Sequence, residues 1–141
     1  MKLSEIVLYI KSAKNKAEKI DRLKEHDSPE LRILLKGSYD PKIKWLPELS
    51  GIKYKKSKKK KFESNLIDIT KTLYNYVETP PNLNLLEEKK KIFVSVLETL
   101  YKDDAELLMS VINKSIKSDY KISIPIVKEA LGWNKDYNRR L

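Results

Sequence analysis

The residues most able to do chemistry in this sequence are lysines gathered in one short stretch. They lie around Tyr54 and Ser57 and comprise Lys53, Lys55, Lys56, Lys58, Lys59, Lys60 and Lys61. A lysine ammonium suits phosphate groups, and each phosphate that it neutralises releases condensed counterions. The stretch therefore predicts contact with nucleic acid. Three other interpretations stay open: a solvated loop without function, contact with a membrane or protein surface, and a localisation signal.

Two further groups of polar residues are candidates for the same contact. Lys42 and Lys44 stand beside Trp45, and a second group precedes the last predicted helix. That group consists of Lys114, Lys117, Lys121 and Ser123. Only four of the 30 basic residues are arginines, which leaves 26 lysines. Because arginine is the usual reader of guanine edges, the composition predicts contact with the phosphate backbone rather than recognition of base sequence.

Aromatic residues interleave with these lysines. Tyr39, Trp45 and Tyr54 flank basic residues, an arrangement that can stack the bases of a single strand. Tyrosines at helical spacing, such as those in the second half of the chain, are more simply core or half-buried residues.

The sequence offers little for catalysis. It has no cysteine, which excludes a disulfide scaffold, a thiolate metal site and a cysteine nucleophile. The single histidine, His26, lies at a predicted helix end, where a cation favours the terminal carbonyls. Asp103 and Asp104 resemble a catalytic carboxylate pair, but one of them is better explained as a helix N-cap. No phosphate-binding glycine loop or nucleophile elbow is present. We expect a non-enzymatic protein without metal or cofactor.

Length and charge narrow the class of protein. A chain of 141 residues is enough for one domain with its own core. Its net charge of +10 would fall to +3 without the seven lysines of residues 53–61. Such a surplus indicates a polyanionic partner, nucleic acid first and an anionic membrane second, unless it reflects an AT-rich genome. No apolar run approaches the ~20 residues that cross a bilayer, so we expect a cytoplasmic protein.

Helices are expected to position the candidate residues. In the first third of the chain, the apolar residues have the spacing of helices. Leu3, Ile6, Val7 and Ile10 form one stripe, and a second short helix is expected to follow through Leu23. Ser28 and Pro29 are a strong start signal for a third helix, and Gly37 is expected to end it in a left-handed conformation. Residues 43–47 predict a short apolar helical turn closed by a proline.

The rest of the chain is also predicted to be helical, apart from a lysine-rich loop at residues 48–63. One helical pattern covers residues 66–77. Asn84 and Asp103 each stand three residues before a glutamate, the spacing of a capping box that starts a helix. Ser123 starts the last helix, and Gly132 ends it. We therefore expect an all-α, single compact bundle of about six or seven short helices over residues 1–132, followed by a basic C-terminal tail at residues 133–141.

The order of these segments resembles the N-terminal helical DNA-binding domain of ATP-dependent DNA ligases of tailed phages. The first part of the match runs over residues 6–47 and includes Tyr39 and the Ile-Lys-Trp-Leu-Pro segment that starts at Ile43. The segment from Lys102 to Leu108 is similar to a Lys-Asp-Asp-Val-Glu-Val-Leu segment of the ligases. Ile122-Ser123-Ile124 falls where the ligases have Val-Ser-Ile. The chain also resembles small proteins of T4-like phages.

The resemblance implies a DNA-gripping module that acts in the cytoplasm of an infected host cell. In the ligases a separate domain forms the lysyl-adenylate at a Lys-x-Asp-Gly motif, and this sequence has no such motif. It also departs from the ligases before the last helix, where Asp119 and Tyr120 replace a glycine that approaches a phosphate. The lysines of residues 53–61 have no counterpart in the ligases.

Together these observations predict a non-catalytic, largely sequence-independent DNA-binding protein that contacts the phosphates of duplex DNA. The alternative is a phage interaction module that binds and redirects a replication or transcription protein of the host or the phage. Acidic surfaces of such a partner would use the same lysines.

Overall fold

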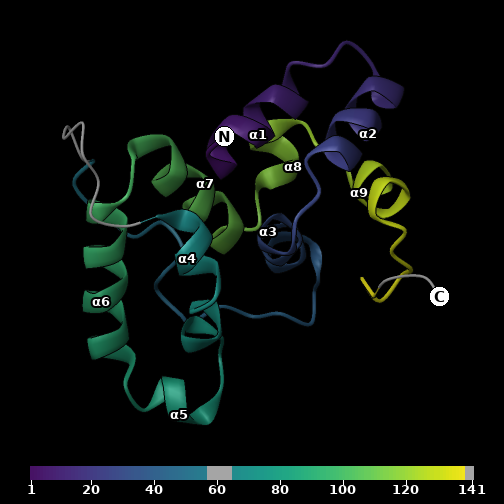
Figure 1. Cartoon of the computed structure of the whole chain (residues 1–141). Helices are drawn as coiled ribbons and strands as arrows, with labels where there is room; N and C mark the ends of the chain where they lie inside the picture. The colour runs from purple at the N-terminus through teal and green to yellow at the C-terminus, as the bar shows by residue number, and fades with distance from the viewer. Residues whose placement is uncertain (57–64, 139–141) are drawn as a thin grey trace.

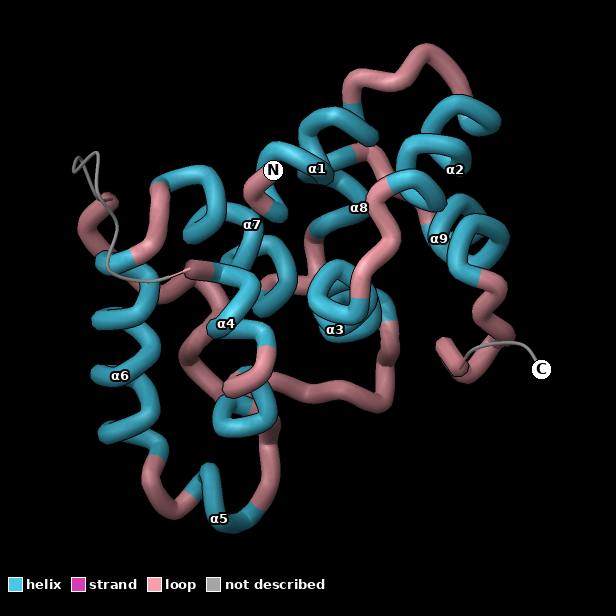
Figure 2. The backbone as a smooth tube through the Cα atoms, in the orientation of Figure 1, coloured by secondary structure: helices cyan, strands magenta, loops and turns pink. Residues whose placement is uncertain are grey.

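The computed structural model describes residues 1–56 and 65–138, and in this part of the chain the protein is all-α, as predicted (Figure 1). The longer helices are α1 (Leu3–Lys11), α2 (Lys16–Glu25), α3 (Pro29–Tyr39), α6 (Leu86–Thr99), α7 (Lys102–Ile112) and α9 (Ile124–Leu131). Single turns are added by α4 (Leu66–Thr70), a 3-10 helix (Leu73–Tyr76), α5 (Pro80–Leu83) and α8 (Ile116–Tyr120). With these single turns, the described residues contain more helices than the six or seven expected. Figure 2 shows the loops that join them.

Two of the predicted helix ends are confirmed. The Ser28 side chain caps α3 by accepting a hydrogen bond from the Leu31 amide at 3.1 Å, with Pro29 in the first turn. Gly132 ends α9 with a φ of 66°, a left-handed conformation that favours glycine.

Gly37 was expected to end α3, and this prediction is wrong. The helix continues to Tyr39, and Gly37 lies inside it against the indole of Trp45. A Cβ atom on Gly37 would lie 2.7 Å from Cζ2 of Trp45, and the indole nitrogen donates a hydrogen bond to the Gly37 carbonyl at 3.0 Å. The glycine is therefore required for close packing rather than for its backbone conformation. The predicted helical turn at residues 43–47 is also absent, because Trp45 forms an isolated antiparallel bridge with Val77.

The two predicted capping boxes are also wrong. Leu85, not Asn84, is the residue before α6, and Tyr101, not Asp103, is the residue before α7. Asp104 instead lies in the first turn of α7, almost completely buried, and accepts a hydrogen bond from the Ser4 amide at 3.1 Å. The carboxylate thus joins α7 to the start of α1, a tertiary role that its sequence neighbours do not reveal.

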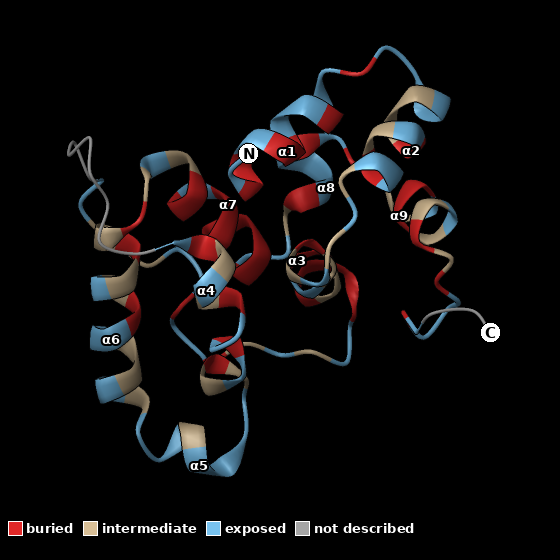
Figure 3. Ribbon diagram, in the orientation of Figure 1, coloured by how far each residue is buried: buried red, intermediate tan, exposed pale blue. Residues whose placement is uncertain are grey.

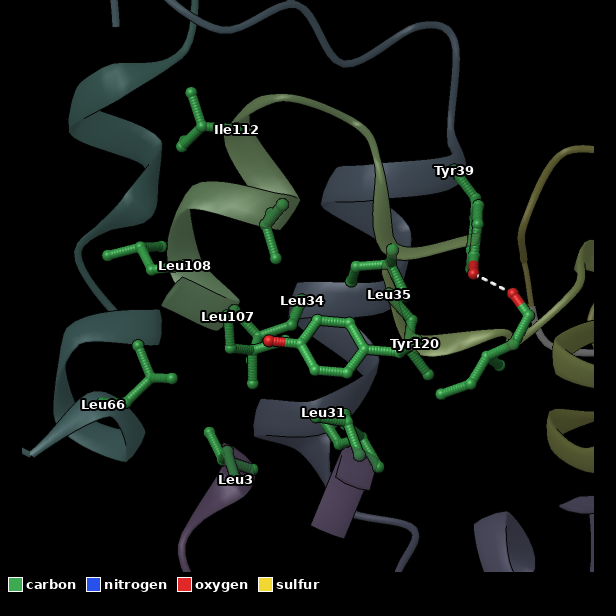
Figure 4. Close-up of a cluster of buried hydrophobic side chains, with 14 of the residues drawn as sticks. Leu3, Leu31, Leu34, Leu35, Tyr39, Leu66, Leu107, Leu108, Ile112 and Tyr120 are labelled. Atoms are coloured by element: carbon green, nitrogen blue, oxygen red, sulfur yellow. Dashed lines mark hydrogen bonds between the residues drawn. The ribbon is translucent and has the colours of Figure 1, made fainter. Parts of the chain in front are cut away.

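The core is centred on α7, which contacts α1, α3, α4 and α8. Figure 3 shows the buried faces of α7 and α3 turned toward the middle of the molecule. In Figure 4, Leu34, Leu107 and Tyr120 lie together in this core, and the Tyr39 hydroxyl donates a hydrogen bond to the Ile122 carbonyl. The C-terminal end of α3 is therefore held against the segment that joins α8 to α9.

The packed core extends past residue 132, into the segment expected to be a polar tail. Trp133 and Tyr137 are both buried, with their rings edge to face at 6.4 Å between centroids. The Arg32 guanidinium lies over the Trp133 ring, 5.9 Å from its centroid. The described part of the C-terminal segment, through Asn138, is thus attached to the helical body.

Candidate nucleic-acid interface

The described lysines of the lysine-rich stretch lie against α6 and α7. Lys53, Lys55 and Lys56 are exposed. The Lys55 amide donates to a Glu98 carboxylate oxygen at 2.8 Å, and Lys56 Nζ lies 2.7 Å from Oε1 of Glu106. The hydrogen bond and charge of Glu106 raise the pKa of Lys56. One ammonium of the stretch is therefore paired with a carboxylate. Lys58, Lys59, Lys60 and Lys61, which were predicted to bind phosphates, lie outside the described residues.

Lys42 and Lys114 are brought together at the C-terminal end of α3. Both contact the buried Asp40: the Lys42 amide donates to its carboxylate at 2.9 Å, and Lys114 Nζ donates to its carbonyl at 2.8 Å. Burial lowers the pKa of Lys114. Lys42 Nζ also lies 3.8 Å from Asp136. Lys114 thus has a structural role here, joining the end of α7 to the end of α3.

Lys44 is exposed on the short segment that pairs with residues 76–78. Its carbonyl accepts a hydrogen bond from the Glu78 amide at 2.7 Å, next to the bridge between Trp45 and Val77. Lys44 therefore lies on the segment that pairs with residues 76–78, whereas Lys42, the other lysine predicted beside Trp45, contacts Asp40 at the end of α3.

Lys117 and Lys121 are exposed at the junction between α8 and α9. Within residues 1–56 and 65–138, no carboxylate lies at ion-pair distance from either ammonium. Lys121 has a φ of 55°, which turns the chain into α9. Ser123 precedes that helix and is partly buried, and its hydroxyl does not cap the helix. Both lysines are therefore available for a phosphate.

Two lysines that the sequence did not single out join this junction. Lys19 Nζ donates a hydrogen bond of 2.6 Å to the Lys121 carbonyl, across 102 positions of sequence. Lys11 and Lys121 both lie close enough to Asp119 to lower its pKa, after the larger effect of hydrogen bonds from two serines. We call the four lysines Lys11, Lys19, Lys117 and Lys121 the basic surface.

The helices explain why these distant lysines meet. Helix α2 packs on α9 and α1 packs on α8, so the N-terminal helix pair lies over the α8–α9 junction (Figure 1). No local signal reveals this docking, because the spacing of lysines within α2 is that of an ordinary solvated helix face. The packing of α1 on α8 and of α2 on α9 brings Lys11 and Lys19 to the segment that carries Lys117 and Lys121.

The structure gives His26, a residue considered for catalysis, a place at a helix end. His26 follows α2 as its cap residue, as predicted for a helix end, and its ring meets Tyr9 edge to face at 5.5 Å. Among the residues that the structure describes, no three His, Cys, Asp or Glu side chains gather in a way that could hold a metal ion. In the same residues no helix has the length and hydrophobicity needed to cross a bilayer.

Comparison with known proteins gives the family of the chain. The chain belongs to the DUF6433 family, described as a family of unknown function, and the match covers residues 6–118. It starts within α1 and ends within α8, so Lys11, Lys19 and Lys117 lie inside it and Lys121 lies just beyond. No curated protein and no solved structure matches the chain.

Proposed function

We propose that this protein binds DNA through the phosphate backbone, largely without regard to base sequence and without catalysing a reaction. The observation that carries the proposal is the contact between Lys19 Nζ and the Lys121 carbonyl, which places lysines of α2 and of the α8–α9 junction side by side. Lysines that the fold gathers from distant segments raise the local positive potential, which attracts an anionic partner.

The chemistry of the cluster favours phosphates over bases. Its members are all lysines, which act as point charges on phosphates, and arginine forks that read guanine are absent from it. The net charge of +10 adds a long-range attraction to any polyanion. We further propose that the protein acts in the cytoplasm of an infected cell as a module similar to the DNA-gripping domain of phage ligases.

Salt-dependent binding tests this function. Fluorescence anisotropy with duplex, nicked and single-stranded DNA of unrelated sequences should give similar affinities for different sequences of each form. If about five phosphates are neutralised, log affinity should fall against log salt with a slope of about −4 to −5. An affinity independent of salt, or a strong preference for one duplex sequence, would contradict the proposal.

A matched pair of triple variants locates the binding surface. Changing Lys19, Lys117 and Lys121 to glutamine should weaken binding and reduce the salt slope by about one for each phosphate that is no longer neutralised. The control changes Lys71, Lys91 and Lys102, which are exposed lysines at the end of α4 and in α6 and α7, and removes the same charge. Equal weakening in both variants would show that net charge alone carries binding, and that no particular surface does.

A second candidate function is supported by exposed apolar side chains on the 3-10 helix, on α5 and along the first half of α6. Tyr74, Leu83, Leu85 and Ile92 are all exposed there, and Asn82 fastens α5 to the preceding turn by hydrogen bonds to the Tyr74 and Val77 carbonyls. Apolar residues grouped in this way are typical of protein interaction surfaces. This alternative, a module that binds and redirects a replication or transcription protein, predicts binding that persists at high salt.

Incubation with ATP tests the non-catalytic part of the proposal. The sequence has no Lys-x-Asp-Gly motif for lysyl-adenylate formation, so mass spectrometry should find no covalent adenylate and nicked DNA should stay unsealed. Detection of an adenylate would overturn this part of the proposal and leave the DNA-binding part unaffected.

A further inference from the structure

A cavity of about 590 Å³ lies next to the basic surface, between α1, α7, α8 and the start of the lysine-rich stretch. Its volume is within the usual range for small-molecule sites. Lys11 of the basic surface lines it, and so does Lys56 of the stretch. The cavity therefore lies between the two groups of lysines, which otherwise belong to separate parts of the molecule.

Part of the cavity lining is apolar and includes an aromatic ring. Leu8, Ile52 and Met109 line it together with Tyr54. The Tyr54 side chain is only partly buried against the core, so part of its ring is available to a ligand. A tyrosine beside aliphatic side chains can hold a flat, weakly polar group by stacking.

The polar lining includes the carboxylates of Asp103, Glu106 and Asp119, which can accept hydrogen bonds. Ser110 and Ser115 both donate to Oδ2 of Asp119 at 2.6 Å, and Lys56 donates to Oε1 of Glu106 at 2.7 Å. In the described part of the chain, the second oxygens of the Asp119 and Glu106 carboxylates accept no hydrogen bond from another residue. A ligand of this cavity should therefore combine a flat apolar body with hydrogen-bond donors.

We propose that this cavity receives an unpaired nucleobase, stacked on Tyr54, while the flanking phosphates lie on Lys11 and Lys56. This inference rests on the proposed function and gives it a preferred form of ligand, a single strand or a strand end. Because the free acceptors belong to carboxylates, bases with an exocyclic amino group are favoured over thymine. A carboxylate accepts a hydrogen bond from such a group, as in its pairing with cytosine N4.

Single strands of about eight nucleotides test the inference by fluorescence anisotropy at one fixed salt concentration. Oligodeoxycytidine should bind more tightly than oligothymidine, and both should bind more tightly than an abasic strand of the same length and charge. Tyr54→Leu should weaken binding of oligodeoxycytidine by about tenfold, whereas Tyr54→Phe, which keeps the ring, should retain it. Tyr74→Leu is the matched control, because Tyr74 is an exposed tyrosine that does not line the cavity.

A second measurement uses the unaltered protein, so that a folding defect in Tyr54→Leu cannot decide the result. Addition of oligodeoxycytidine should shift the amide resonances of Gly51 and Ser110, which line the cavity, more than an abasic strand does. Shifts confined to the basic surface would overturn the inference.

The outcomes separate this inference from the function on which it rests. If duplex DNA binds with the expected salt dependence but bases add nothing over the abasic strand, the cavity does not take a base and the proposed function stands. If no nucleic acid binds, both fail. If spermidine, used as a probe, shifts the cavity resonances while oligodeoxycytidine does not, the site takes organic cations and the inference is wrong.

Discussion

A single glycine shows how closely α3 and the segment after it are packed. Gly37→Ala places a Cβ atom 2.7 Å from Cζ2 of Trp45 and 3.0 Å from Cγ1 of Val111. The hydrogen bond from the indole to the Gly37 carbonyl prevents the ring from moving away freely. Alanine gains about 1 kcal/mol of helix propensity, but overpacking costs about 1–3 kcal/mol. We therefore expect a net loss of unfolding free energy, measured by urea denaturation.

The same substitution in a Trp45→Leu background is the control for this prediction. There the ring that blocks the new methyl group is gone, so alanine should be neutral or stabilising through its helix propensity. Equal destabilisation in both backgrounds would show that the indole is not the cause.

Asp119 should make stability depend on pH in the acid range. Hydrogen bonds from Ser110 and Ser115, with a smaller contribution from nearby lysines, lower its pKa in the folded protein. The folded pKa is below the unfolded value of about 3.9, so the carboxylate stabilises the fold above that pH. This contribution is lost as pH falls through the folded pKa. Asp119→Asn should therefore lower the unfolding free energy at neutral pH, and the deficit should shrink in acid; a constant deficit would contradict this prediction.

At the scale of elements, the apolar period predicted the longer helices and failed for the shorter ones. The stripes that became α1, α3 and α9 are long enough to show a helical period. Residues 66–77 were expected to form one helix, yet they divide into α4 and a 3-10 turn. A single turn has too few residues to show a period, so local packing decides its geometry. The roles of Gly37 and Asp104 depend on Trp45 and Ser4, contacts that no local pattern encodes.

The candidate site was predictable only in part, because contacts between distant segments leave no local sequence pattern. Lys117 and Lys121 were identified from sequence because they precede a recognisable helix. Lys11 and Lys19 were not, because they join the basic surface only through the packing of α1 on α8 and α2 on α9. The cavity beside them could not be predicted from the sequence either, since its lining comes from residues as far apart as Leu8 and Tyr120.

The segment after α9 should act as part of the folded unit. Trp133 is 4% exposed and Tyr137 is 8% exposed, and Arg32 of α3 lies over the Trp133 ring. Replacing a buried tryptophan by alanine typically costs about 3–5 kcal/mol. Trp133→Ala should lower the unfolding free energy by this order, measured by denaturant titration. Tyr74→Ala, which removes an exposed ring, is the control and should change it by less than about 0.5 kcal/mol.

At the scale of the whole molecule, two groups of described lysines are candidates for contact with a polyanion. The basic surface lies over the α8–α9 junction, and the described lysines of the stretch at residues 53–61 lie against α6 and α7. The cavity separates the two, with Lys11 on one side of it and Lys56 on the other. This arrangement fits a strand that crosses the cavity better than two independent sites, because a continuous polyanion can use both groups at once.

The last prediction separates the contributions of these two groups of lysines. Changing Lys55, Lys56, Lys58, Lys59, Lys60 and Lys61 to glutamine should leave the thermal unfolding midpoint almost unchanged, because the described lysines among them are exposed. Affinity for single-stranded DNA should nevertheless fall by about tenfold or more at low salt, and the salt slope should become shallower. The companion variant changes Lys11, Lys19, Lys117 and Lys121 in the same way.

If a strand uses both groups, each variant should weaken binding and make the salt slope shallower, and their combination should reduce both further. If the first variant binds like the parent and only the companion fails, the stretch is a solvated loop and the basic surface alone carries the function. If neither variant weakens binding, phosphate contact by lysines is not the source of affinity. The exposed apolar residues around α5 then become the surface to test, by substitution with polar residues and a search for binding that survives high salt.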